Sequence, residues 1–330
     1  MHAVVILLIA LPVILWGAEL FTNAVEHVGT IFGVSEGVTG SLLAAVGTAL
    51  PETAIPVLAA FHAGAGQQVA VGAVLGAPLM LATLTMAVMG TAALFSRGFV
   101  DSLTPERSGL RRDLSWFLGV FALALLGLFL PLGPIRYGVA AVLVAAYAAY
   151  VVVTVRASAG LVALGHGTAA SSGLHLLRLR WKRLPGLPYI QLALGLVLIL
   201  GGAQWFVVGI ERLGEAWGIS VLTLALVIVP IATELPEKIN SVLWIRRRQD
   251  TLAFGNVTGA LVFQGSILPA LGLVLTPWRA TPLLVVSMVV TISAVGFLRV
   301  CAAGHADIRV YHLLACGLLY AVFFGYLLAP

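Results

Sequence analysis

The sequence predicts an all-α integral membrane protein with ten transmembrane helices, arranged as two inverted five-helix repeats. Three observations lead to this fold class. Apolar residues make up 61% of the chain and charged residues only 9%, whereas a soluble domain carries about 25% charged residues. The apolar residues also gather into ten stretches of membrane-spanning length, and short segments of the first half recur in the second. These features indicate that lipid, not water, surrounds most of the chain.

Each apolar stretch is long enough to cross the hydrocarbon core as a helix, which needs roughly 20 residues. The first stretch is expected to be a retained helix and not a signal peptide, because no Lys or Arg precedes its apolar run. Discontinuous helices are expected at Pro51 and Pro236, because proline removes a backbone donor and clashes with the preceding turn. The predicted spans are 2–21, 38–61, 68–95, 114–132, 135–155, 189–210, 219–244, 252–276, 281–299 and 309–328.

The placement of the cations predicts the topology. The loops after the third, fifth, seventh and ninth spans carry fourteen of the eighteen Lys and Arg residues, and the opposite loops carry three. Cationic loops stay in the cytoplasm, so we expect both termini outside the cytoplasm, in the cell inner membrane. Residues 157–188 are expected to form a cytoplasmic linker with a basic segment that rests on anionic lipid, a regulatory role being the alternative. Because the cations lie in these loops, the bilayer and not nucleic acid is the expected partner.

An internal repeat divides the chain into a first unit at 1–156 and a second at 189–330. Each copy holds an odd number of helices, so the second must enter the membrane from the opposite side. Inverted repeats are typical of secondary transporters, whose sites lie near the midplane where the copies meet. The alternative is a duplicated scaffold without transport. The matching segments are Gly17–Phe21 with Gly202–Phe206, Gly33–Ser35 with Gly218–Ser220, Thr48–Glu52 with Thr233–Glu237, and Gly72–Gly76 with Gly255–Gly259.

The most informative repeated segments run from Gly47 to Glu52 and from Ala232 to Glu237. Each places a carboxylate in an apolar helix, where a charge costs about 2.5–3.5 kcal/mol on insertion scales. Carbonyls freed by proline, a threonine hydroxyl and the carboxylate form an oxygen-rich group suited to a hard cation such as Na⁺ or Ca²⁺. If a pseudo-twofold axis relates the copies, Glu52 and Glu237 face each other. The alternative is a protonated glutamate that hydrogen-bonds for packing.

These segments resemble the alpha repeats of the cation/calcium exchanger superfamily, whose signature reads Gly-Thr-Ser-Leu-Pro-Glu. The resemblance covers essentially the whole chain. It implies antiport, commonly of Na⁺ or H⁺ against Ca²⁺, with Glu52 and Glu237 as central ligands and Thr48 and Thr233 contributing oxygens. The transported cation is then cargo, no cofactor is implied, and the chain is not an enzyme.

The second half of the family pattern departs from the superfamily. Residues 72–81 have lost every expected polar ligand, whereas 255–264 keep Asn256 and place Gln264 where an acid or amide is expected. The motif serines are replaced by Ala49 and Glu234. The candidate ligand set therefore gains Glu234 and Gln264, and the polar residues concentrate in the second copy.

Glu234 and Lys238 lie four residues apart, the favourable orientation for a helical ion pair. Two interpretations remain open: an internal pair whose charges cancel, or Lys238 acting as a built-in cation that occupies or gates a position Na⁺ would fill elsewhere. Glu234 and Glu237 share a helix face, which Asn240 and Ser241 continue. The hypothesis is cation antiport with altered stoichiometry or ion choice, H⁺ being the coupling ion that needs fewest ligands. The rival hypothesis is a transport-inactive structural or regulatory membrane protein. Neither hypothesis assigns an oligomeric state.

Overall fold

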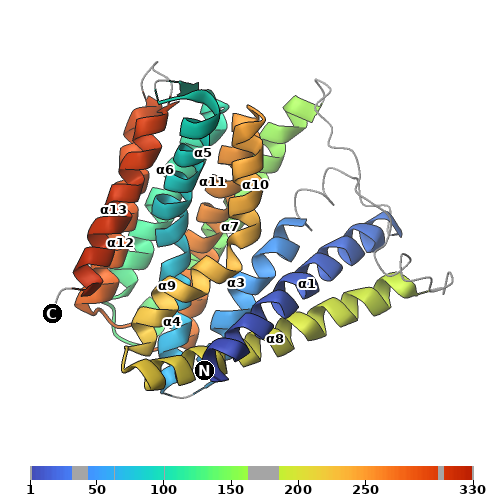
Figure 1. The fold of residues 1–330 in the computed structure, drawn as a ribbon, viewed down its shortest axis with the longest axis vertical. Coiled ribbons are helices and arrows are strands. Elements are labelled where there is room, and N and C mark those ends of the chain that lie inside the picture. The colour runs from blue at the N-terminus through green and yellow to red at the C-terminus, as the bar shows by residue number, and fades with distance from the viewer. Residues whose placement is uncertain are drawn as a thin grey trace. The chain divides into compact units, whose positions relative to one another are not determined.

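A computed structural model describes residues 2–31, 44–62, 64–99, 101–162, 186–303 and 308–328, and these are almost entirely helical (Figure 1). The helices are α1 (His2–Ile31), α3 (Ala44–Ala60), α4 (Ala65–Met80), α5 (Met86–Arg97), α6 (Arg107–Gly127), α7 (Pro134–Val162), α8 (Leu187–Trp217), α9 (Val221–Thr233), α10 (Leu235–Arg246), α11 (Asp250–Leu275), α12 (Pro282–Ala303) and α13 (Val310–Leu328), with a π-helical segment η2 (Leu81–Thr85) between α4 and α5. Most of the predicted linker, residues 163–185, lies outside the described residues.

Each predicted span has a helical counterpart, although the number of membrane crossings stays a prediction. Within the described ranges, seven helical segments are long and apolar enough to cross a membrane. The other three predicted spans correspond to α3, to α6 and to the pair α9–α10. Helix α6 has 21 residues but opens with arginines. The chain is therefore a largely helical integral membrane protein. The seven segments are His2–Val25, Ala65–Arg97, Pro134–Ala157, Leu187–Trp217, Asp250–Leu275, Pro282–Ala303 and Val310–Leu328.

The discontinuity expected in the second motif is confirmed. Helix α9 ends at Thr233 and α10 begins at Leu235, and between them Glu234 adopts φ −91° and ψ 9°, in the sparsely allowed bridge region. Pro236 occupies the first turn of α10, where its missing N–H would have no intrahelical partner in any case. The second motif therefore breaks its helix at one residue.

The discontinuity expected in the first motif is wrong within the described residues. Helix α3 runs from Ala44 to Ala60 across Pro51. A proline removes only one backbone hydrogen bond, and membrane helices tolerate it where Ser or Thr side chains satisfy nearby carbonyls. Pro51 leaves the Gly47 carbonyl, four residues earlier, without its helical donor, and the helix continues; the Thr53 hydroxyl donates to the nearby Ala49 carbonyl at 2.7 Å. The two motifs therefore differ in backbone as well as in sequence.

Packing divides the chain into two units, and each takes segments from both predicted repeats. The first unit comprises residues 1–66 and 155–221, and the second comprises 67–154 and 222–330. In the first unit α1 and α8 lie side by side (Figure 1). A Cβ atom added to Gly195 of α8 would lie 2.7 Å from the backbone nitrogen of Phe21. Glycine therefore permits this close approach, as small residues commonly do between membrane helices.

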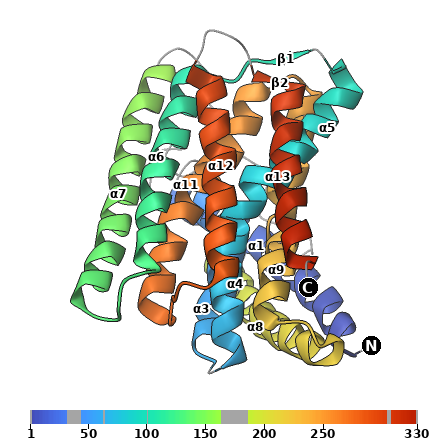
Figure 2. The ribbon, with the colours of Figure 1, turned by 90° about the vertical axis from the view of Figure 1, so that its left-hand side faces the viewer.

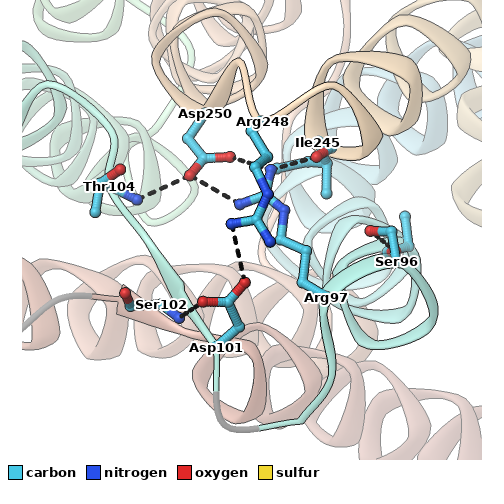
Figure 3. Close-up of polar contacts among 9 residues, drawn as sticks. Ser96, Arg97, Asp101, Ser102, Thr104, Ile245, Arg248 and Asp250 are labelled. Atoms are coloured by element: carbon cyan, nitrogen blue, oxygen red, sulfur yellow. Dashed lines mark hydrogen bonds and ion pairs between the residues drawn. The ribbon is translucent and has the colours of Figure 1, made fainter.

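One end of the second unit is held by a network of charges drawn from separate loops (Figure 3). The carboxylate of Asp250 accepts hydrogen bonds from Arg97 Nη1 at 3.0 Å, from Arg97 Nη2 at 2.6 Å and from the Thr104 backbone N–H at 2.9 Å. Both charged side chains of this pair are almost fully buried. Arg248 and Asp101 form a second, more exposed pair at 3.3 Å.

A short antiparallel ladder completes the same end. Strand β1 (Ser102–Leu103) pairs with β2 (Ile308–Arg309), Ser102 opposite Arg309. These two-residue strands are the only departure from the predicted all-α class among the described residues. The loops after the third, seventh and ninth predicted spans thus meet at one end of the unit, which confirms that these three lie on one side.

Candidate functional site

The break between α9 and α10 forms a buried polar site within the second unit. The Glu234 side chain is fully buried, and its Oε2 lies 3.4 Å from Lys238 Nζ. The Lys238 ammonium also donates to the Pro230 carbonyl at 3.2 Å and to the Met80 sulfur at 3.1 Å. An ammonium has three donors, and here it makes two hydrogen bonds and one ion pair. Lys238 is therefore held in place as an internal cation.

Helix α4 reaches this site because two glycines let it approach α9 closely. A Cβ atom on Gly76 would lie 2.7 Å from Pro230 Cγ and closer still to the Leu226 carbonyl oxygen. A Cβ atom on Gly72 would lie 2.6 Å from the Ala225 side chain. Such small residues one turn apart are typical of tightly packed membrane helices. The close approach places Met80, four residues beyond Gly76, against Lys238.

Two further side chains at the site carry oxygens available to a ligand. Glu237 is 8% exposed and Gln264 is 3% exposed. Among the described residues, neither Glu237 Oε2 nor Gln264 Oε1 has a hydrogen-bond partner. Gln264, from α11, lies beside the Glu234 carboxyl group. Buried oxygens without partners cost free energy in a purely structural role, so their presence favours a ligand-binding role.

Thr233, the last residue of α9, adds a hydroxyl group to this site. Thr233 is 2% exposed and its hydroxyl donates to the Val229 carbonyl at 3.2 Å, so its oxygen can still accept a ligand. The second unit holds another buried hydroxyl, that of Thr85 at the end of η2, which has no hydrogen-bond partner among the described residues; no hydrogen bond therefore joins it to the Glu234 site. π-Helical segments are rare and often accompany functional sites.

The polar face of α10 continues through Ser241 and not through Asn240. Asn256 of α11 donates from Nδ2 to Ser241 Oγ at 3.2 Å and to the Glu237 carbonyl oxygen at 3.4 Å. Asn240 is exposed and does not join these contacts. Ser241, four residues beyond Glu237, therefore follows the helical period more closely than Asn240, which is three residues beyond.

The candidate residues of the first motif lie in the other unit. Glu52 is buried on α3. Thr48 belongs to the same helix, but its side chain lies outside the described residues. The structure therefore brings together Glu234, Glu237 and Gln264 in the second unit, whereas the assignment of Glu52 and Thr48 still rests on the sequence repeat.

The described residues contain no group of three or more His, Cys, Asp or Glu side chains arranged to hold a metal ion. The polar site instead combines two carboxylates with amide, hydroxyl and carbonyl oxygens. Such mixed oxygen sets suit hard cations.

Comparison with known protein families shows which family this chain belongs to. The model of the family described as "Sodium/calcium exchanger protein" matches residues 2–156 and 187–329. The chain belongs to the sodium/calcium exchanger family. It is therefore a membrane transporter by family, not an enzyme.

Two similar proteins cover most of this exchanger-family chain. The putative antiporter CaxA of Alkalimonas amylolytica is 26% identical over 280 residues, covering 83% of this chain and 81% of the relative. The inner membrane protein YrbG of Escherichia coli strain K12 is 28% identical over 283 residues, covering 85% and 82%.

Two solved structures share the fold. The H⁺/Ca²⁺ exchanger CAX has a TM-score of 0.71 at 18% identity, over 99% of this chain and 82% of that one. A structure of the sodium-calcium exchanger NCX_Mj has a TM-score of 0.59 at 21% identity, over 98% of both chains.

Within this exchanger-family chain, sequence reasoning missed Met80 as a member of the site, and it noted Asn256 without assigning it to the site. The Met80 side chain has a sulfur but no oxygen, so a search of the sequence for oxygen ligands does not select it. Asn256 had a usable signal, because it is the amide that the family pattern retains.

Proposed function

We propose that this chain is a secondary active antiporter that exchanges Ca²⁺, or a related divalent cation, for Na⁺ or H⁺. Transport would proceed by alternating access around a carboxylate site near the membrane midplane. The observation that carries the proposal is the buried group of Glu234, Glu237 and Gln264 at a helix break. Family membership and the antiporter and exchanger names of the similar proteins support it.

The proposed ligands follow from which oxygens are available. Glu237 and Gln264 offer atoms without other hydrogen-bond partners among the described residues, and Thr233 offers a hydroxyl oxygen. We assign Glu52 and Thr48 to the same task from the sequence repeat. Ca²⁺ takes about six to eight oxygens, so backbone carbonyls and water complete the shell.

Lys238 is proposed to act as a permanent internal cation. Its ammonium lies 3.4 Å from Glu234, where it neutralises a carboxylate that would otherwise attract a monovalent ion. Lys238 thus takes the place of a bound Na⁺, which reduces the number of Na⁺ ions that the chain can bind. It favours coupling to H⁺, because H⁺ needs only a carboxylate. The alternative, an ion pair that serves packing alone, predicts the same resting geometry but no effect of Lys238 on cation binding.

The proposal includes the membrane arrangement. Ten crossings form two inverted repeats, at 1–156 and 189–330, joined by the cytoplasmic linker 157–188. Both termini lie outside the cytoplasm. An inner-membrane location is supported by the similar Escherichia coli protein, which is described as an inner membrane protein.

Cation binding to the purified chain tests the ligand assignment. Titration with Ca²⁺ is expected to show binding to the wild type and a large loss for Glu237→Gln and for Glu52→Gln, because each loses a ligand charge. Glu215→Gln, an exposed position at the end of α8, is the matched control and is expected to bind like the wild type. Equal Ca²⁺ affinity in all four proteins would remove these carboxylates from the site.

A transport-inactive membrane protein is the second candidate, favoured by one observation. Residues 72–81 carry packing residues in place of the family's polar ones, and Met80 and Pro230 already satisfy the Lys238 ammonium. This candidate predicts a folded chain that binds none of Ca²⁺, Na⁺ or other cations in the same titration.

A further inference from the structure

A groove runs along α6 beside α7 in the second unit, and none of its lining residues belongs to the carboxylate site. It has a volume of about 410 Å³ and is lined mainly by apolar surface. Trp116 Nε1 donates to the Ala146 carbonyl at 3.2 Å and so joins α6 to α7 at this place. Figure 2 shows α6 lying between α7 and α12. The lining residues are Arg112, Ser115, Trp116, Gly119, Val120 and Ala146.

A fixed guanidinium forms one wall of the groove. Arg112 donates from Nε and Nη2 to Asp113 Oδ1, at 3.1 Å and 3.0 Å, and its Cζ lies 5.8 Å from the centre of the Tyr150 ring. The Asp113 carboxylate is itself anchored by the hydroxyls of Tyr150 at 3.0 Å and Thr258 at 2.8 Å. The Asp113 pair does not use Arg112 Nη1, so this nitrogen can still donate to a ligand.

A second guanidinium stands at the same wall. Arg299 of α12 donates from Nε to Ser115 Oγ at 2.6 Å, and because Ser115 is neutral the bond leaves the arginine's charge uncancelled. Arg111 lies close by on α6 and donates from Nη2 to the Ala303 carbonyl at 2.9 Å, at the end of α12. One end of the groove is therefore strongly basic.

The remainder of the groove is apolar and open. Gly119 is exposed, and a Cβ atom added there would meet nothing within 4 Å. In an integral membrane protein an exposed apolar face contacts lipid. The basic end also belongs to the side predicted to be cytoplasmic, where basic pockets between membrane helices bind the head groups of anionic lipids.

We propose that this groove is a binding site for an anionic phospholipid. One acyl chain lies along Gly119 and Val120, and the phosphate lies between Arg112 and Arg299. A lipid bridging α6 and α12 would hold these helices together at the basic end. The inference uses none of the carboxylate-site residues and stands independently of the proposed ion exchange.

Native mass spectrometry of the full chain tests the proposal. The purified protein is mixed with phosphatidylglycerol and phosphatidylcholine of the same chain length, and retained lipids are counted. We expect the wild type to retain phosphatidylglycerol preferentially. Arg299→Gln should lower that preference about five-fold, the equivalent of the ~1 kcal/mol that one arginine contributes near an anionic surface.

Two glycine variants separate lipid binding from folding. Gly119→Leu places a side chain in the groove, at a position where the Cβ atom meets nothing within 4 Å, and should abolish retention of phosphatidylglycerol. Gly138→Leu, at an exposed glycine of α7 whose Cβ would also meet nothing within 4 Å, should retain it like the wild type. Unchanged retention in both Gly119→Leu and Arg299→Gln overturns the site. A wild-type mass of one or two chains without retained phosphatidylglycerol also overturns it, because the groove then holds no phospholipid.

Discussion

Replacing Lys238 by methionine removes the internal cation while keeping much of the side-chain volume. In the wild type the Lys238 ammonium contacts Glu234, the Pro230 carbonyl and the Met80 sulfur. In Lys238→Met the fully buried Glu234 carboxylate loses its nearest positive charge. We therefore expect the variant to need a proton or an added cation in order to fold stably.

The geometry sets the size of the effect. Two unit charges at the 3.4 Å separation of this pair attract by about 5 kcal/mol at an effective dielectric constant of about 20. Removing one partner of a buried pair typically costs about 3–5 kcal/mol. Lys238→Met should therefore lose about 3–5 kcal/mol of unfolding free energy at neutral pH. Removing both charges in Glu234→Gln/Lys238→Met should restore most of it, because no charge is then left buried alone.

Unfolding in mixed micelles by added dodecyl sulfate, followed by circular dichroism, measures these free energies. The deficit of Lys238→Met should shrink when the pH is lowered or Na⁺ is added, because either neutralises the Glu234 carboxylate. Arg248→Met is the matched control: this arginine is 66% exposed in its pair with Asp101, and such pairs contribute about 0–1 kcal/mol. A Lys238→Met deficit no larger than that of Arg248→Met, and insensitive to pH and Na⁺, would refute the internal-cation assignment.

Three further predictions concern the packing of α8 against α1, the loop network and the cap of α6. Gly195→Ala should destabilise the chain by about 1–3 kcal/mol in the same unfolding assay, because the added methyl overpacks α8 against α1. Gly201→Ala, whose Cβ meets nothing within 4 Å, should not destabilise it. Asp250→Asn should cost about 3–5 kcal/mol by leaving Arg97 buried without its counter-charge, and a loss below ~1 kcal/mol would contradict the network in Figure 3. Glu106 is the N-cap of α6, and its carboxylate accepts hydrogen bonds from the backbone N–H groups of Ser108 and Gly109, each at 2.7 Å. Burial alone would raise the pKa of Glu106, but these hydrogen bonds lower it below the ordinary 4.5. Its contribution as the helix cap, about 1 kcal/mol by analogy with other caps, should thus be complete above pH 4.5 and disappear as the pH falls through the lowered pKa, so that Glu106→Ala matches the wild type only in acid.

The helices were largely predictable because lipid imposes a simple rule. Every apolar run of about 20 residues must be helical, since backbone groups in hydrocarbon have no other partners. The meeting of three basic loops at one end was likewise predictable from charge placement. The helix of the first motif was not: the same proline that accompanies a break near Glu234 is accommodated inside α3, and the repeated sequence carries no sign of this difference.

The polar residues of the site were predictable from the sequence, but the contacts that depend on how the helices pack were not. The carboxylates Glu234 and Glu237 and the amide Gln264 stand out because charged and amide groups are costly in lipid. The contact of Lys238 with Met80 depends instead on the close approach of α4 to α9, which two glycines permit. A sequence shows the glycines but not which helix they approach.

Ion flux into proteoliposomes tests the central claim most directly. The wild-type chain and Glu237→Gln are reconstituted separately, and Ca²⁺ uptake is followed after an outward gradient of H⁺ or of Na⁺ is imposed. The account predicts gradient-driven uptake by the wild type and none by Glu237→Gln, with the H⁺ gradient the more effective because Lys238 occupies a cation position. Ca²⁺ uptake that persists unchanged in Glu237→Gln, or a wild type that moves no Ca²⁺ or related divalent cation under either gradient, would contradict it.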